Sequence, residues 1–185
     1  MGYERARLTA ARARATGAAN LRYAGRMTDR FQIRPAEAGD VAEVAALAAK
    51  LVALHHDFDA ARFFLPERVA EGYAWWFGQE LGRPEVLLLV AVVGGRIAGY
   101  AYGRLEARDW NQLLDASGAL HDLWVEPEAR GSGIAKALVD AIVTGLVARG
   151  APRVVLHAAE ANRSAQALFA SLGFRRTMVE MTREA

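Results

Sequence analysis

The feature that most constrains the fold is a glycine-rich turn that joins an apolar segment to a helical one. Residues Arg130-Gly131-Ser132-Gly133 follow an apolar run ending at Val125 and precede a helical pattern that reaches residue 149. The first amides of a helix lack intrahelical partners, and the helix dipole adds partial positive charge there. Glycines have no Cβ, so the oxygens of a ligand can approach these amides. The turn therefore predicts an anion site, suited to a pyrophosphate, between a strand and a helix.

Hydrophobic periodicity predicts the elements on either side of the turn. Strands are expected at 31–36, on both sides of Gly94-Gly95 as a hairpin, and at 119–125, 153–159 and 174–183. A first helix should follow Asp40, which with Glu43 forms a capping-box pattern, and a second should run from Pro66 to residue 81. Further helices are expected to residue 149 and at 163–172, the last closed by Gly173. The order β-α-α-β-β-β-α-β-α-β predicts an α/β (mixed α+β) fold with helices on both faces of a mixed sheet.

The charge of the chain is unevenly distributed. Residues 1–26 contain six arginines and one acidic residue, a net charge of +5, whereas the other 159 residues carry a net charge of −3. We expect residues 27–185 to form a single domain, with residues 1–26 as a basic, Ala/Arg-rich extension. That extension is an upstream sequence ahead of a start at Met27, a flexible arm with a binding role, or a targeting segment. The domain itself is not basic, so we expect no nucleic-acid partner.

Other classes of protein are disfavoured by composition. The chain has no cysteine, which excludes disulfides and thiol catalysis. It has no run of 18 apolar residues, so we expect no membrane partner and a cytoplasmic location. The four histidines lack the spacing of a zinc motif, so we expect no metal: His55, His56, His121 and His157. The adjacent pair is expected to be solvated helix surface.

The phosphate motifs of two large classes do not fit the turn. An ATP-type loop requires Gly-Lys-Ser/Thr at its end, and residues 131–138 do not contain it. A dinucleotide fingerprint requires a third small residue where this chain has Lys136. A turn that uses glycine only for backbone geometry stays open as the simplest alternative.

A third pattern, Gln/Arg-x-x-Gly-x-Gly/Ala, fits Arg130, Gly133 and Ala135. Downstream, residues 157–174 contain an asparagine beyond a strand, then a short helix with a Leu-Gly-Phe ending. In this order the chain from about residue 31 to residue 182 resembles the GCN5-related N-acetyltransferase (GNAT) superfamily. The resemblance implies a central, mostly antiparallel sheet flanked by helices on both faces, with strands four and five splayed.

The resemblance also implies acetyl-CoA as co-substrate, without a metal. It places the pyrophosphate on the turn and the pantetheine arm along strand four, with an asparagine and a ring from the last helix beside it. The implied cofactor-binding residues are Leu123, Trp124, Val125, Arg130, Gly131, Ser132, Gly133, Ile134, Ala135, Asn162 and Phe169. Asn162 is equally suited to cap the helix that follows it.

For catalysis, the family comparison favours strand four. His121 is the first candidate base and Glu126, at the end of the strand, is the second. Strand alternation predicts that His121 shares a face with Leu123 and Val125, and that Asp122 and Trp124 face the other side. Many relatives carry a tyrosine that protonates the leaving thiolate, and this chain has Phe169 at that position. Tyr100 and Tyr102 are candidate replacements, although packing in the core or the pocket wall is the favoured explanation for both.

The expected function is acetyl-CoA-dependent N-acetylation of a primary amine, in a small molecule or peptide, by direct attack on the thioester. Acidic and aromatic side chains between residues 55 and 77 would suit a cationic amine. The alternative is a non-catalytic acyl-CoA-binding sensor, which Phe169 permits. Only eleven residues follow Phe174, so a last strand that is short, missing or supplied by a second subunit is expected, and a homodimer is a reasonable hypothesis.

Overall fold

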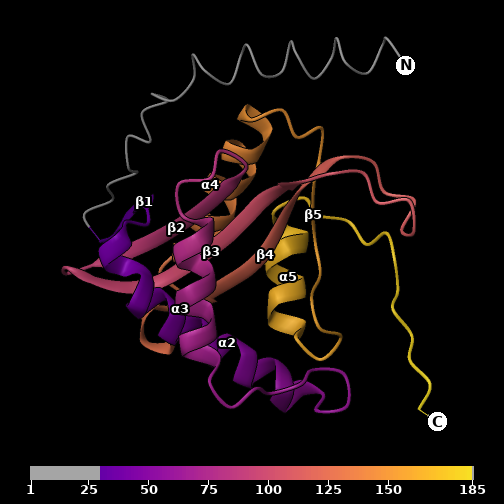
Figure 1. Ribbon diagram of the computed structural model, residues 1–185, viewed down its shortest axis with the longest axis horizontal. Coiled ribbons are helices and arrows are strands. Elements are labelled where there is room, and N and C mark those ends of the chain that lie inside the picture. The colour runs from indigo at the N-terminus through magenta and orange to yellow at the C-terminus, as the bar shows by residue number, and fades with distance from the viewer. Residues whose placement is uncertain (1–29, 185) are drawn as a thin grey trace.

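A five-stranded sheet forms the centre of the described chain (Figure 1). The computed structural model describes residues 30–184. The strands are β1 (Gln32–Pro35), β2 (Val86–Val93), β3 (Arg96–Glu106), β4 (Ser117–Val125) and β5 (Val154–Leu156). They lie in chain order, and the pairs from β1 to β4 are antiparallel whereas β4 and β5 are parallel. The expected mixed, mostly antiparallel sheet is confirmed.

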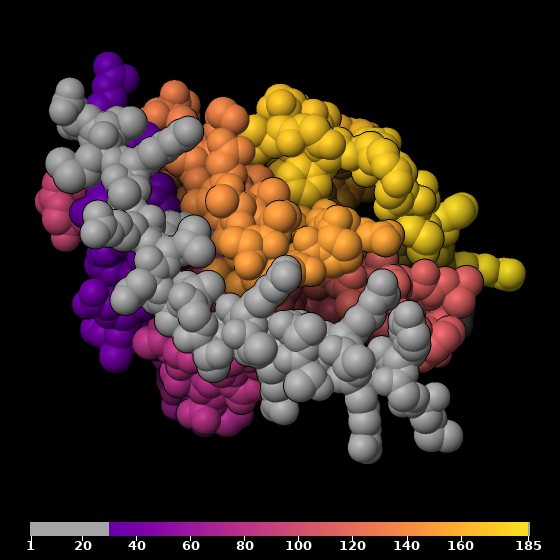
Figure 2. Space-filling view, turned by 90° about the horizontal axis from the view of Figure 1, so that it is seen from above, coloured from indigo at the N-terminus to yellow at the C-terminus, as the bar shows by residue number. Residues whose placement is uncertain are grey.

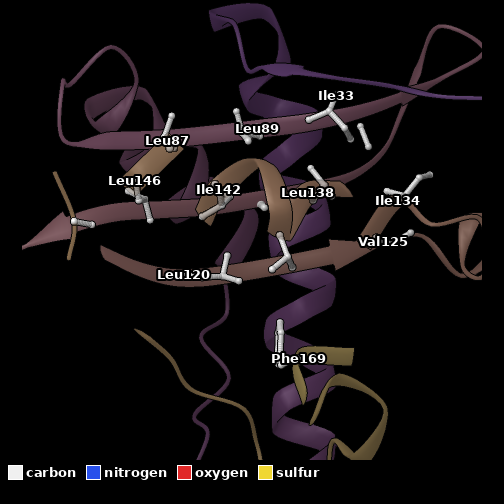
Figure 3. Packing of buried hydrophobic residues seen from close by; sticks show 14 residues of the cluster. Ile33, Leu87, Leu89, Leu120, Val125, Ile134, Leu138, Ile142, Leu146 and Phe169 are labelled. Atoms are coloured by element: carbon white, nitrogen blue, oxygen red, sulfur yellow. The ribbon is translucent and has the colours of Figure 1, made fainter. Parts of the chain in front are cut away.

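Helices cover both faces of this sheet, as expected. Helices α2 (Val41–Phe58) and α3 (Val69–Glu80) lie on one face, and α4 (Ile134–Ala148) and α5 (Arg163–Ser171) on the other. Each face has its own buried core. Leu138, Ile142 and Leu146 of α4 pack on Leu87, Leu89 and Leu120 of the sheet, with Phe169 of α5 at the edge of this cluster (Figure 3). On the opposite face, α2 and α3 pack on Tyr100, Tyr102 and Trp124.

The start of the first helix differs from the expected capping box. A short 3₁₀ turn, η1 (Ala38–Asp40), precedes α2, and the carboxylate of Asp40 accepts hydrogen bonds from the amide of Glu37 at 2.7 Å and from Arg34 at 2.6 Å. Glu43 instead accepts a hydrogen bond from the amide of Ile97 at 3.2 Å. The capping-box prediction was wrong because Arg34, six residues upstream, holds the Asp40 carboxylate in a strong charge-assisted pair.

Three other boundaries differ. Helix α3 begins at Val69 rather than Pro66, and β5 spans three residues rather than 153–159. No strand forms at 174–183, so the final-strand prediction was wrong. Gly173, with φ at +87°, closes α5 as expected, and the ring of Phe174 folds back onto Phe169, which turns the following chain away from the sheet.

The C-terminal segment 175–184 runs along the outside of the molecule beside the β3–β4 hairpin (yellow and salmon in Figures 1 and 2). Arg62, in the α2–α3 connection, forms an ion pair with Glu180 there. Met178, Val179 and Met181 of this segment are exposed. The basic extension at 1–26 lies outside the described residues. Within residues 30–184, no helix is both long and apolar enough to cross a bilayer.

Candidate active site

Strands β4 and β5 are paired only along the first half of β4 and then diverge. Strand β5 pairs only with Gly118, Ala119 and Leu120, whereas β4 continues to Val125. Beyond Leu120 no strand of the described chain lies on that side of β4, so backbone donors and acceptors face an open gap there. The splay of strands four and five is thus present, and it leaves an edge on which an extended ligand can form sheet-like hydrogen bonds.

A β-bulge in β4 lies at the point where the strands part. Tyr102 pairs with Asp122 and the next residue, Gly103, pairs with Leu120, so His121 is the extra residue. Its ring lies 5.5 Å from the ring of Tyr102, on the face covered by α2 and α3. The predicted alternation was therefore wrong for His121, because the bulge puts it on the same face as Asp122.

The alternation resumes after the bulge. Leu123 and Val125 face α4, and Trp124 packs in the core beneath α2 and α3. Two titratable neighbours on β4, His121 and Asp122, therefore face α2 and α3, the helices whose acidic and aromatic residues were expected to suit a cationic amine.

The glycine turn has the backbone that the anion-site hypothesis requires. Gly131 and Gly133 have φ angles of +76° and +89°, and a Cβ placed on either would meet no atom within 4 Å. Glycine is thus needed for the left-handed backbone, and space beside it is open. Within the described residues, amides 131–136 donate to no protein acceptor, and the first α4 hydrogen bond runs from the amide of Ala137 to the carbonyl of Gly133.

Side chains brace the turn against the end of β4. Arg130 donates from Nε to the carbonyl of Val125 at 3.1 Å, and its guanidinium lies 5.2 Å from the centre of the Trp124 ring. Ser132 Oγ donates to the carbonyl of Ala129 at 2.5 Å. Arg130 therefore occupies the last carbonyl of the strand and fixes the loop, while the amides of the turn stay accessible.

His121 is held by a carboxylate. Its Nε2 lies 2.9 Å from Oε1 of Glu106, and both side chains are about two-fifths exposed, at 41% and 38%. An ionised carboxylate can only accept a hydrogen bond, so Nε2 carries the proton and Nδ1 of the neutral ring offers its lone pair. This is the arrangement of a base with an orienting partner.

Asp122 lies on the face that strand alternation predicted for it, and the bulge brings His121 to the same face. Its carboxylate is partly buried and accepts a 3.1 Å hydrogen bond from the phenol of Tyr100. Burial raises the pKa of Asp122 above its usual range, although the Tyr100 hydrogen bond acts in the opposite direction. No local sequence pattern reveals this burial, because it depends on packing with Tyr100 of β3 beneath α2 and α3.

Glu126, the second candidate base, is already engaged. Its carboxylate forms an ion pair with Lys50 of α2 and accepts a 3.2 Å hydrogen bond from the indole of Trp124. Burial acts to raise the pKa of Glu126, but these hydrogen bonds outweigh it and the pKa lies below its usual range. The carboxylate ties α2 to the end of β4, which suits a structural role better than proton transfer.

The candidate replacement acids are buried. Tyr100 donates to Asp122, and Tyr102 donates to Oε2 of Glu80 at 2.7 Å. Burial first, and the adjacent carboxylate second, raise the pKa of both phenols. Both face α2 and α3, whereas Phe169 packs in the α4 core.

Two further predicted cofactor residues, Asn162 and Ile134, have defined contacts within the fold. Asn162 caps α5, and its Oδ1 accepts a hydrogen bond from the amide of Ala165 at 3.1 Å, as the helix-cap alternative predicted. Ile134 is buried in the α4 core, so only its amide can face a ligand. Among residues 30–184, no group of three or more His, Asp or Glu side chains could hold a metal ion.

A model of the acetyltransferase (GNAT) family matches residues 51–174. The chain belongs to this family. The match runs from α2 to Phe174 and so covers the splayed strands, the glycine turn and α5.

Similar curated proteins are mycothiol acetyltransferases. The chain is 31% identical to that of Thermobispora bispora over 127 residues, which is 67% of this chain and 33% of the relative. It is 32% identical to that of a Nocardioides species over 149 residues, 75% of this chain and 47% of the relative. The chain thus spans less than half the length of these relatives.

Solved structures share the fold at low sequence identity. A Bacillus halodurans protein matches with a TM-score of 0.70 and 23% identity over 83% of this chain and 98% of its own. An aminoglycoside N-acetyltransferase crystallised with CoA matches with a TM-score of 0.68 and 17% identity, over 84% and 94% of the two chains. A Clostridium acetobutylicum protein described as a predicted acetyltransferase, with acetyl-CoA, has a TM-score of 0.63 and 18% identity, over 82% and 96%.

Proposed function

We propose that the protein is an acetyl-CoA-dependent N-acetyltransferase that acts on a primary amine of a small molecule or peptide. The observation that carries the proposal is the row of amides at 131–136, which donate to no acceptor within residues 30–184, beside the open side of β4. These amides and the dipole of α4 suit a pyrophosphate. The backbone of Leu123, which no strand of the described sheet pairs on the β5 side, suits a linear arm. Family membership and the CoA complexes of structural neighbours support the same cofactor.

In the proposed reaction the neutral amine nitrogen attacks the carbonyl carbon of the thioester. A C–N bond forms, the C–S bond breaks, and coenzyme A leaves as a thiolate. Nδ1 of His121 receives the proton that the amine loses, and Glu106 stabilises the resulting imidazolium. Phe169 cannot donate a proton, so solvent protonates the thiolate.

The test is turnover of acetyl-CoA with a panel of small amines and peptides, read by the thiol released. Because the chain contains no cysteine, a thiol reagent reports only coenzyme A. Hydrogen exchange supplies the binding readout: we expect coenzyme A, but neither ATP nor NAD, to protect the amides of Gly131 and Gly133.

A non-catalytic acyl-CoA sensor is the second candidate, and Phe169 in place of the usual acid favours it. Protection of the turn by coenzyme A, without turnover of any amine in the panel, would support the sensor and refute the enzyme. Protection by ATP or NAD as well would refute both.

A homodimer is a further proposal. Segment 175–184 lies outside the sheet with Met178, Val179 and Met181 exposed, and β5 ends the sheet with only three paired residues. A strand contributed by a second copy of the chain would cover the exposed side chains of segment 175–184 and the β5 edge of the sheet. A monomeric mass in light scattering at micromolar concentration would contradict it.

A further inference from the structure

The carboxylate of Asp122 has no lysine or arginine partner in the described chain. Among residues 30–184, no lysine or arginine forms an ion pair with it, and its hydrogen bond comes from the neutral phenol of Tyr100. Other acids with little exposure do have such partners: Arg34 pairs with Asp40, Lys50 with Glu126 and Arg104 with Glu80. Buried charges in proteins are normally paired, so Asp122 is an exception that calls for a ligand.

Two histidines lie near Asp122, but both direct their N–H groups elsewhere. Nδ1 of His55, near the end of α2, is 2.9 Å from the carbonyl of Leu51, which can only accept, so the proton lies on Nδ1. His121 donates from Nε2 to Glu106. Neither of these N–H groups is directed to Asp122, although both imidazoles are close enough that a positive charge on either would lower its pKa.

Aromatic rings complete the surroundings. Tyr100 packs on Phe77 at 6.0 Å between ring centres, and Tyr102 packs on Trp76 at 4.8 Å. Burial raises the pKa of the Tyr73 phenol on α3, and Tyr73 is close enough to Asp122 that the charge of this carboxylate raises it further. A carboxylate, imidazole lone pairs and aromatic rings together favour an alkylammonium ion over an anion or an apolar group.

We propose that Asp122 binds a second, non-reacting ammonium group of the acceptor, so that the preferred acceptor carries two amino groups. This inference rests on the proposed acetyltransferase function. Because the bulge puts His121 and Asp122 on one face, the reacting nitrogen lies at Nδ1 of His121 while the other nitrogen stays charged at Asp122. Short aliphatic diamines and diamino sugars share this chemistry.

The experiment compares two acceptors of matched length, 1,4-diaminobutane and 4-amino-1-butanol, in which a hydroxyl replaces one ammonium. We expect the wild-type protein to favour the diamine by about tenfold or more in kcat/KM, as one charge-assisted contact would provide. Asp122→Asn should raise KM for the diamine by about the same factor and change values for the amino alcohol by no more than about threefold. A third measurement, with a diamino sugar as acceptor, distinguishes an aliphatic diamine from a sugar diamine as the preferred acceptor.

The outcomes distinguish this inference from the function on which it rests. Turnover of both acceptors with equal kcat/KM would refute the second-ammonium site and leave the acetyltransferase intact. A fall in kcat of Asp122→Asn by the same factor for both acceptors would also overturn it, because Asp122 would then serve the reaction rather than the second ammonium. Glu184→Gln, which removes one negative charge from an exposed side chain, is the matched control and should retain the diamine preference.

Discussion

The phenol of Tyr100 on β3 donates a 3.1 Å hydrogen bond to the carboxylate of Asp122 on β4. Tyr100 is fully buried, so the pair extends from the core beneath α2 and α3 to the bulge at His121. The contact satisfies one oxygen of Asp122 but does not neutralise its charge. The negative charge of Asp122 is therefore required by the proposed ammonium site, whereas its burial lowers the stability of the ligand-free fold.

Asp122→Asn should stabilise the ligand-free protein at neutral pH. The folded pKa of Asp122 is raised by burial, so ionisation costs stability as pH rises from the unfolded pKa through the folded one. Asparagine cannot ionise and can still accept the Tyr100 hydrogen bond. We expect Tm at pH 7.5 to rise by roughly 2–4 °C, which corresponds to about 1 kcal/mol in a domain of this size. The gain should shrink as pH falls toward 4, and a lower Tm at pH 7.5 would contradict the account.

Gly133→Ala should weaken binding of coenzyme A by about tenfold or more and cost about 1 kcal/mol of stability. The φ angle of +89° strains alanine, and its Cβ would occupy the open space beside the turn. Gly82→Ala is the matched control, since Gly82 has a φ angle of +85° and equally open surroundings just after α3. Calorimetry should show the same loss of stability in both variants and a loss of affinity only in Gly133→Ala.

His121→Gln should lower kcat/KM by about 10²-fold or more and change its dependence on pH, because the general base is lost. Glu106→Gln should lower kcat/KM by a smaller factor, about tenfold, since it disturbs only the orienting hydrogen bond. Both variants should bind coenzyme A like the wild type. Full activity with an unchanged pH profile in His121→Gln would eliminate the imidazole as base.

Glu126→Gln should retain kcat/KM within about threefold, because the Lys50 ion pair already holds this carboxylate in its charged form. A small loss of stability is expected because the ion pair between Lys50 of α2 and residue 126, just after β4, is lost. A loss of activity as large as that of His121→Gln, at unchanged coenzyme A affinity, would restore Glu126 as the candidate base.

Glu80→Gln should destabilise the fold by about 3 kcal/mol, because the buried carboxylate accepts hydrogen bonds from Tyr102 and Arg104. Removing its charge leaves the Arg104 guanidinium without its buried partner. Chemical denaturation of the ligand-free protein measures the change, and an unchanged midpoint would show that the network contributes little.

The sequence by itself determined the order of the elements up to α5 and the left-handed backbone of the glycine turn. Both depend on local chemistry: hydrophobic period identifies the helices and the hairpin at Gly94-Gly95, and the φ angles of Gly131 and Gly133 suit only glycine. The helix cap at Asn162 is equally local, since its side chain reaches an amide three residues away.

Only the tertiary structure decided what the side chains of β4 face. The register shift at His121 arises from pairing with β3, some twenty residues earlier, and one extra residue moves His121 onto the face of Asp122. Lys50, 76 residues from Glu126, decides that this carboxylate is engaged. Non-local contacts of this kind leave no periodic pattern in the sequence, which is why the glycine turn was predictable and the position of His121 was not.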